Sequence, residues 1–97
     1  LSDADLSDAY LFRADLNGAK LPDVRLTNAN LKNAELRDAS LIRADLTNTD
    51  LSGADLTNAS LNDAELTGIT ATNLKGCPIS LPKGWVCENN LLRELLI

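Results

Sequence analysis

Leucine recurs at every fifth position along most of the chain, and this period is the strongest constraint on how the chain can fold. Fourteen consecutive leucines, from Leu1 to Leu66, keep the spacing. On a helix, which turns by ~100° per residue, leucines at this spacing would spread around the whole surface. On a flat strand an odd spacing sends successive side chains to opposite faces. The chain must therefore turn a corner every five residues if all the leucines share one interior.

Two other positions of the five-residue unit are also nearly constant. The residue two before each repeat position is Ala in eleven of fourteen cases, with Val24, Thr49 and Ile69 as the exceptions. The residue two after each Leu is Asp, Asn or Gly in twelve of fourteen cases, with Arg13 and Arg43 as the exceptions. Asp, Asn and Gly tolerate left-handed backbone, so this position predicts the corner. Leu and the small residue then point inward.

The five-residue unit resembles a known repeat. The clearest units are Ala4–Asp8, Ala14–Gly18, Ala44–Asn48 and Ala54–Asn58. They are similar to the A(D/N)LXX unit of the pentapeptide-repeat family, and thirteen such units run in register from Ala4 to Gly68. The resemblance implies an all-β fold, a right-handed quadrilateral parallel β-helix (a β-solenoid) with four pentapeptides per coil and about 3.5 coils.

The composition agrees with a narrow interior of leucine and alanine. Hydrophobic residues make up 44% of the chain, yet it has one Trp, one Tyr, one Phe and no Met. We expect the interior to contain Leu6, Leu11, Leu16, Leu21, Leu26, Leu31, Leu36, Leu41, Leu46, Leu51, Leu56, Leu61, Leu66, Ala14, Ala34 and Ala54.

A coil of twenty residues predicts which outward residues stack on one another. Like charges at the ~4.8 Å spacing of neighbouring strands repel, so an all-acidic column either attracts a cation or basic partner or is tolerated as solvated surface. The predicted columns are Asp5, Arg25, Asp45 and Glu65; Tyr10, Asn30 and Asp50; Asp15, Glu35 and Asp55, which is all acidic; and Lys20, Ser40 and Ser60.

Three apolar residues fall at positions predicted to face outward, namely Tyr10, Phe12 and Ile42. They are either ordinary surface or a candidate contact patch for a partner or a second copy of the chain. The repeat already begins at Leu1, without a capping segment or an initiating Met. An uncapped end predicts end-to-end or dimeric self-association, or else a preceding neighbour or a processed start.

The repeat loses its regularity toward the C-terminus. Ala71 stands at a leucine position and Gly76 is the next departure. We therefore expect a solenoid over 1–76 and a capping segment over 77–97, anchored by Trp85 and Leu81. The runs 76–78 and 81–87 resemble tails of cyanobacterial members of the pentapeptide-repeat family. The alternative is that the leucine-rich tail docks onto another chain.

The last residues of the tail predict a short helix. Asn89 or Asn90 is a suitable N-cap. The apolar side of this helix would consist of Leu91, Leu92, Leu95 and Leu96.

Both cysteines, Cys77 and Cys87, lie in the capping segment. They form either a disulfide or two buried thiols, and two cysteines alone leave this open. We expect no zinc site here, because two thiols without histidine leave two ligands missing. The expected location is cytoplasmic. The alternative is the thylakoid lumen or periplasm, if the pair is a disulfide and a signal has been removed.

The chain carries little catalytic chemistry. It has no His, which removes the commonest general base and zinc ligand, and it has no phosphate-binding glycine loop, so we expect no enzyme activity, cofactor or metal. The net charge of −5 argues against direct binding to nucleic acid or an anionic membrane, and no apolar run is long enough to span a bilayer.

These features predict a rigid acidic module that binds an unidentified protein. The alternative comes from the resemblance: some family members imitate duplex DNA and bind DNA gyrase. A column ~17 Å tall corresponds to only about five base pairs, so such a mimic would need stacked or dimerised copies.

Overall fold

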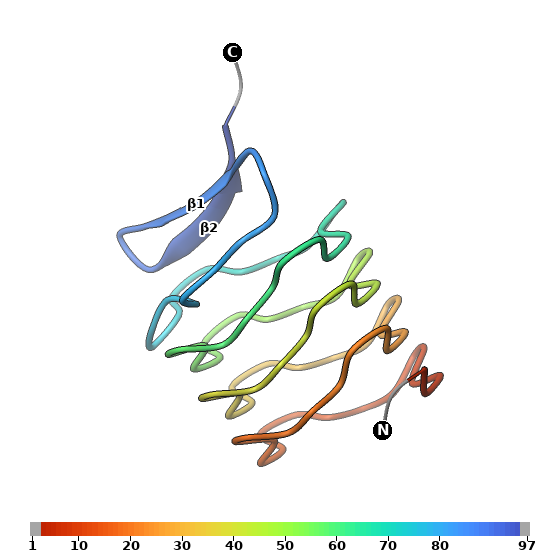
Figure 1. Cartoon of the computed structure of the whole chain (residues 1–97). Coiled ribbons are helices and arrows are strands. Elements are labelled where there is room, and N and C mark those ends of the chain that lie inside the picture. The colour runs from red at the N-terminus through yellow and green to blue at the C-terminus, as the bar shows by residue number, and fades with distance from the viewer. Residues whose placement is uncertain (1–2, 96–97) are drawn as a thin grey trace.

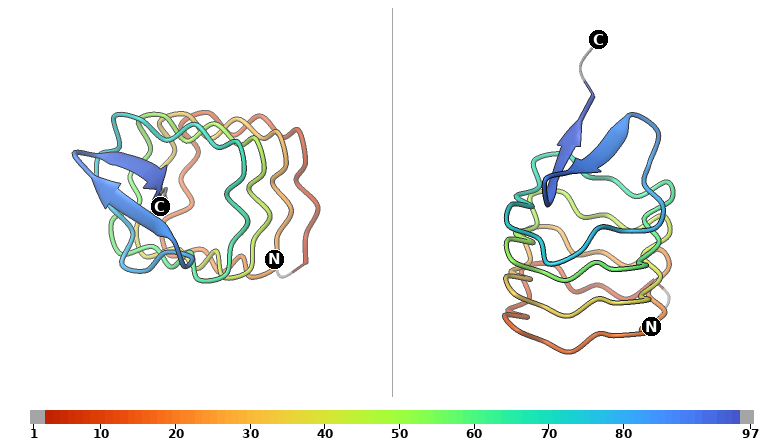
Figure 2. Two further views of the ribbon diagram at one scale, coloured as in Figure 1. Left: turned by 90° about the horizontal axis from the view of Figure 1, so that it is seen from above. Right: turned by 90° about the vertical axis from the view of Figure 1, so that its left-hand side faces the viewer.

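The computed structural model describes residues 3–95, which form four stacked coils closed at the C-terminal end by a β-hairpin (Figure 1). Twelve parallel bridges join neighbouring coils in this part of the chain, and all but one connect residues twenty apart, as in Asp5 with Arg25. This spacing confirms the predicted outward columns. Viewed along the axis, each coil has a four-sided outline (Figure 2). We number the coils one to four, over 3–20, 21–40, 41–60 and 61–80.

The corners of the coils are tight turns with left-handed backbone. The amide of Ala9 donates to the carbonyl of Leu6 at 3.1 Å, and between them Asp8 has a φ of 65°. A positive φ at the third residue alone defines a type II turn. Arg13 (φ 61°) and Arg43 (φ 58°) adopt the same conformation although they break the Asp/Asn/Gly rule. The corner position was therefore correctly predicted even where its residue type is unusual.

Two glycines at corners allow a test of this geometry. Gly18 and Gly53 have nearly the same φ, 71° and 72°, but an added Cβ would meet nothing at Gly18 and would overlap the side-chain amide of Asn33 at Gly53. We expect Gly18→Ala to cost about 1 kcal/mol of unfolding free energy from backbone strain. Gly53→Ala should cost slightly more, because the Asn33 side chain must also turn aside, as measured by urea denaturation. A smaller loss for Gly53→Ala than for Gly18→Ala would contradict the stacking of Gly53 on Asn33.

The interior is filled by leucine from coil two onward. Leu21 and Leu66 are 2% exposed and the leucines between them are fully buried, which contributes about 1.5–3 kcal/mol each. In the first coil Leu6, Leu11 and Leu16 are half-buried, as is Ala14, because only one neighbouring coil covers them. The structure places Ala34 and Ala54 in the buried interior.

One interior position holds a polar side chain. Thr49 replaces the usual Ala and is fully buried. Its Oγ1 donates a hydrogen bond of 2.6 Å to the carbonyl oxygen of Leu26 in the coil before. The buried hydroxyl is thus paired, so this departure from the repeat leaves no unsatisfied polar group.

Coil four departs from the regular register through a β-bulge. The amide of Lys75 donates to the carbonyl of Ala54 at 2.9 Å, whereas the amide of Leu56 donates to the carbonyl of Gly76 at 3.2 Å. Two residues therefore stand opposite Asp55, which is the definition of a bulge. A Cβ on Gly76 would overlap Oγ1 of Thr57, so a larger residue would have to displace this hydroxyl, which is bonded to Asp55.

The regular coil register returns only at Ser80. The amide of Ile79 donates to the carbonyl of Ala59 at 2.8 Å, a separation of twenty residues where the regular coils have twenty-one, as from Ser60 to Ala39. Inter-coil bonding continues to Ser80, whose carbonyl accepts from the amide of Leu61 at 3.1 Å. The ladder therefore runs beyond Gly76, the last departure in the sequence pattern.

The helix predicted near the C-terminus is wrong. This segment is an antiparallel hairpin of β1 (Trp85–Glu88) and β2 (Leu91–Glu94). Asn89 and Asn90, predicted as helix caps, have φ values of 51° and 61° and form the two-residue loop. Two positive φ values are the requirement of a type I′ turn, which suits Asn as well as a helix N-cap does. Of the four leucines assigned to the helix, Leu96 lies outside the described residues.

The hairpin covers the last coil through β2. Its Leu92 is 5% exposed, and the Leu92 amide donates to the carbonyl of Ala71 at 3.2 Å. The small Ala71 stands at a leucine position, so Leu92 supplies apolar volume from above. Leu74 is buried at the position normally held by Ala, and its amide donates to the carbonyl of Asn90 at 2.9 Å. The hairpin is thus joined to the coil by both apolar contact and backbone bonding.

The remaining residues assigned to the cap also lie at this end. Trp85 and Leu81 are half-buried against the core. Cys77 and Cys87 form a disulfide, which resolves the alternative left open by the sequence. Within residues 3–95 there is no helix that could cross a lipid bilayer.

Candidate functional site

One side face of the solenoid is hollowed into a groove of about 600 Å³. Its walls come from coils one to four, which the parallel register stacks on one another. The groove is lined by Arg13, Asn33, Ala34, Glu35, Arg37, Asp55 and Lys75. The charged members sum to +1, although residues 1–70 together carry −6. We call this feature the charged groove.

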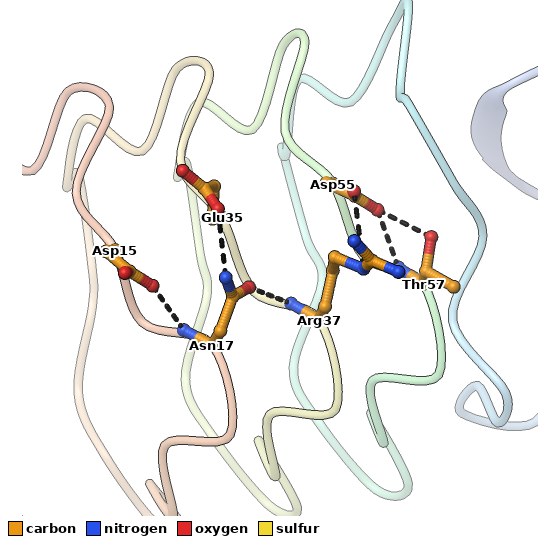
Figure 3. A network of polar contacts seen from close by, with 6 residues as sticks. All are labelled: Asp15, Asn17, Glu35, Arg37, Asp55 and Thr57. Carbon is orange, nitrogen blue, oxygen red and sulfur yellow. Dashed lines mark hydrogen bonds and ion pairs between the residues drawn. The ribbon is translucent and has the colours of Figure 1, made fainter.

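Two acids of the column predicted to be all acidic, Glu35 and Asp55, line the groove. The first two acids of that column, Asp15 and Glu35, are both hydrogen-bonded to Asn17. Asn17 donates from its side-chain Nδ2 to Oε1 of Glu35 at 2.9 Å, and its backbone amide donates to Oδ1 of Asp15 at 3.1 Å (Figure 3). Oδ1 of Asn17 also accepts from the Arg37 amide at 2.9 Å. The Asn17 side chain thus connects coils one and two, and Asn17 engages both carboxylates, that of Glu35 through its side chain and that of Asp15 through its backbone amide.

The third acid of the column, Asp55, has cationic and hydroxyl partners. Oδ1 accepts from the amide of Thr57 at 3.1 Å and from its hydroxyl at 2.5 Å, and Oδ2 lies 3.8 Å from Nε of Arg37. Partial burial raises the pKa of Asp55, but the Thr57 hydrogen bonds and the charges of Arg37 and Lys75 outweigh it and hold the pKa below its ordinary value. The carboxylate is therefore ionised and already engaged.

Beside the groove lies a cluster of Tyr10, Phe12 and Arg13, which we call the aromatic–arginine cluster. Tyr10 is 75% exposed, and the two rings stack with centroids 6.1 Å apart. The guanidinium of Arg13 lies 5.1 Å from the centroid of the Phe12 ring, within the range of a cation–π contact. Arg13 also lines the charged groove, so the cluster and the groove form one continuous surface.

Ile42, the third residue of the predicted patch, does not join this cluster. Its carbonyl accepts from the amide of Asp23 at 2.9 Å, which places it in the first unit of coil three. Phe12 belongs to the third unit of its coil, two sides away around the four-sided outline. The structure therefore brings together Tyr10 and Phe12 only.

Sequence reasoning missed an ion pair at another corner. Arg43 donates from Nε to Oδ1 of Asp23 at 2.9 Å and from a terminal nitrogen to Oδ2 at 3.0 Å, in the fork geometry typical of arginine and carboxylate. This hydrogen bonding lowers the pKa of Asp23. The two residues are twenty apart, so the same offset that predicts the outward columns would have found this pair if applied to the corner position.

Acid should weaken the fold through these carboxylates. The pKa values of Asp23, Asp45 and Asp55 are lower in the folded chain than the ordinary value, so their stabilisation is present above the unfolded pKa of ~3.9 and is lost as pH falls through the lower folded values. We expect the urea midpoint to be level near neutral pH and to fall below about pH 4. Asp23→Asn should flatten this fall relative to Asp8→Asn, a control at another corner. Identical pH profiles for the two variants would contradict the assignment.

No metal-binding constellation accompanies the groove. Over residues 3–95 the structure contains no group of three or more His, Cys, Asp or Glu side chains arranged to hold a metal ion. The arrangement offers ion pairing, hydrogen bonding and aromatic contact, which are the means of binding another molecule.

Comparison with known proteins gives a consistent family. The chain matches the family model described as pentapeptide repeats in eight copies, over residues 1–28, 9–48 and 34–70. No curated protein matches it significantly.

Several solved structures are similar to the chain. A pentapeptide repeat protein from the Arabidopsis thaliana thylakoid lumen has a TM-score of 0.57 and 32% identity, covering 76% of this chain and 62% of that one. Rfr23 from the cyanobacterium Cyanothece 51142 has a TM-score of 0.55 and 27% identity, covering 86% and 60%. A pentapeptide repeat protein from Nostoc has a TM-score of 0.57 and 32% identity, covering 87% and 74%. The chain spans about three fifths of the length of the first two.

Proposed function

Because the chain belongs to the pentapeptide repeat family, we propose that it is a rigid, non-enzymatic module that binds another protein through one face of its solenoid. Family membership implies a right-handed parallel β-helix. Proteins of this family serve in general as structural or interaction modules. The ladder of inter-coil hydrogen bonds holds the side chains of a face in fixed positions, which reduces the entropy lost on binding.

The observation that carries this proposal is the aromatic–arginine cluster. Two of the three aromatic residues of the chain, Tyr10 and Phe12, stand side by side on the outside, with Arg13 against one of them. Tyr and Arg are the residue types most enriched at energetic hot spots of protein interfaces, and aromatic residues are enriched there in general. Of the two rings, Tyr10 is exposed and Phe12 is half-buried, and solubility alone would not require the exposed ring.

The test is a paired substitution with a matched control. We expect Tyr10→Ser with Phe12→Ser to abolish capture of the protein that the unaltered chain retains from a lysate of its source organism. Ile79→Ser should leave capture unchanged, because Ile79 is equally exposed (70%) but lies at the other end of the solenoid. Light scattering then tests whether the captured protein is a second copy of the chain. Unchanged capture and mass in the double variant would exclude the cluster as a contact.

We further propose an oxidising compartment, such as the thylakoid lumen or the periplasm, in place of the cytoplasm expected from the sequence. The Cys77–Cys87 disulfide supports this, because disulfides persist in oxidising compartments and are rare in the cytosol. The similarity to a lumenal protein of Arabidopsis is compatible with it. Alkylation of fractionated cells should find both cysteines blocked from reagent unless a reductant is added first.

Mimicry of duplex DNA toward gyrase is the alternative function, and the ion pairs argue against it. The charge of −6 over residues 1–70 favours a mimic. However, Arg43 lies 2.9 Å from Asp23 and Arg37 lies 3.8 Å from Asp55, so cations interrupt the rows of carboxylates that would stand for phosphates. We expect the purified protein to leave gyrase supercoiling unchanged at micromolar concentrations. Inhibition would instead support the mimic.

A further inference from the structure

We infer that the charged groove binds an extended acidic segment of the partner protein, which runs along the solenoid axis and places an apolar side chain on the aromatic–arginine cluster. This inference rests on the proposed function and specifies the chemistry of the partner. It makes this face the recognition surface of a chain whose repeat is otherwise acidic.

The first argument is the distribution of charge within the groove. Arg13 and Lys75 are exposed, and the Arg37 side chain is 59% exposed. The two carboxylates of the groove are already engaged, Glu35 by Asn17 and Asp55 by Arg37 and Thr57. Three cations and two carboxylates line the groove, so acceptors supplied by a ligand would meet a net charge of +1 here. The rest of the repeat is acidic overall, because residues 1–70 carry −6 and the groove residues among them sum to zero.

The second argument is the residue that continues the acidic column in coil four. Lys75 stands twenty residues after Asp55, and its amide donates to the carbonyl of Ala54 at 2.9 Å, as the amide of Glu35 donates to that of Ala14. The column of three acids therefore ends in a cation. Lys75 lies close enough to Asp55 for its charge to lower the pKa of that carboxyl.

The third argument is the spacing of the groove cations along the solenoid axis. Arg13 belongs to coil one, Arg37 to coil two and Lys75 to coil four. With coils ~4.8 Å apart, the first and last cations are separated along the axis by about 14 Å, which an extended segment crosses in about four residues. The aromatic–arginine cluster lies at the coil-one end. The preferred segment is therefore an apolar residue followed at once by a few acidic residues.

The test uses short fluorescein-labelled peptides and the full chain. One peptide carries phenylalanine followed by alternating glutamate and serine, and its control carries glutamine for glutamate. By fluorescence anisotropy we expect the acidic peptide to bind and the glutamine peptide to bind about tenfold more weakly or not at all, with an affinity that falls as salt is raised. Arg13→Glu and Lys75→Glu should each weaken binding by about tenfold. Lys83→Glu, the same charge reversal in the exposed tail, should not.

Other results would overturn the inference. It fails if Arg13→Glu and Lys75→Glu, shown by circular dichroism to be folded, bind the acidic peptide as the Lys83→Glu variant does. It also fails if a single-stranded oligonucleotide or inorganic phosphate competes with the peptide as effectively as unlabelled peptide, because the groove would then be a general anion site. Loss of partner capture on Tyr10→Ser with Phe12→Ser, together with no peptide binding, would refute this inference while leaving the proposed function in place.

Discussion

Replacing Leu36 with aspartate is expected to abolish the cooperative thermal unfolding of the chain. Leu36 is fully buried, with leucines of the coils before and after it. The substitution removes apolar burial and leaves a carboxylate without a partner in an interior lined by leucine and alanine. Changes of this kind exceed about 4–5 kcal/mol, which approaches the ~5–15 kcal/mol total stability of a typical domain.

The control for this prediction is the same substitution at an exposed leucine. Leu95 is 47% exposed and lies just after β2, so Leu95→Asp should shift the melting temperature by only a few degrees. Circular dichroism melts of the two variants and the parent chain make the comparison. A cooperative transition for Leu36→Asp near that of the parent would show that the leucine column does not form the interior.

Loss of the Cys77–Cys87 disulfide is expected to have the second largest effect. The bridge closes a loop between residues ten apart in sequence, which in the chain-entropy model contributes a little under ~3 kcal/mol. For a chain of this size the corresponding fall in melting temperature is about 10–20 °C. A two-stranded hairpin is marginally stable alone, so β1 and β2 should detach from the last coil before the coils unfold.

Tryptophan fluorescence and circular dichroism distinguish detachment of the hairpin from unfolding of the coils. Trp85 is the single tryptophan and begins β1, so its fluorescence reports on the hairpin, whereas circular dichroism reports on the coils. Cys77→Ser with Cys87→Ser should lower the fluorescence midpoint more than the circular dichroism midpoint. Addition of a reductant to the parent chain should reproduce the result. Coincident and unshifted transitions would show that the disulfide adds nothing to the attachment of the hairpin.

The solenoid could be predicted from the sequence because each position of the five-residue unit requires the same type of residue in every repeat. A leucine returns to the interior every five residues, and a residue tolerant of left-handed backbone stands at each corner. Even Arg13 and Arg43 adopt the corner conformation, since inter-coil bonds impose it on any residue at that position. The prediction therefore did not depend on each residue being typical.

The hairpin could not be predicted in the same way because its sequence is compatible with either a helix or a hairpin. Asn89 and Asn90 suit a helix N-cap and a type I′ turn alike, and the leucines that follow fit either periodicity over so short a segment. The deciding factor is tertiary: Leu92 fills the space above Ala71, and its amide bonds to the carbonyl of that residue. Neither contact has a local sequence signature.

The candidate site was only partly predictable, for a related reason. The twenty-residue offset placed Asp15, Glu35 and Asp55 in one column, but their partners Asn17, Arg37 and Thr57 stand two residues further along each coil. Diagonal contacts of this kind need the side-chain geometry. The same offset extended by one coil would have placed Lys75 after Asp55 in this column, but the bulge at Gly76 has no signal in the repeat pattern.

The constant offset of twenty residues makes the height of the molecule adjustable in discrete steps. Each corner, interior leucine and inter-coil bond of coil three has an equivalent in coil two at the same point of the outline. Removing one whole coil would join chain ends that already share a position on the outline, and the hairpin would meet an equivalent surface. The length of the solenoid can therefore change in steps of ~4.8 Å without a change in the chemistry of its two ends.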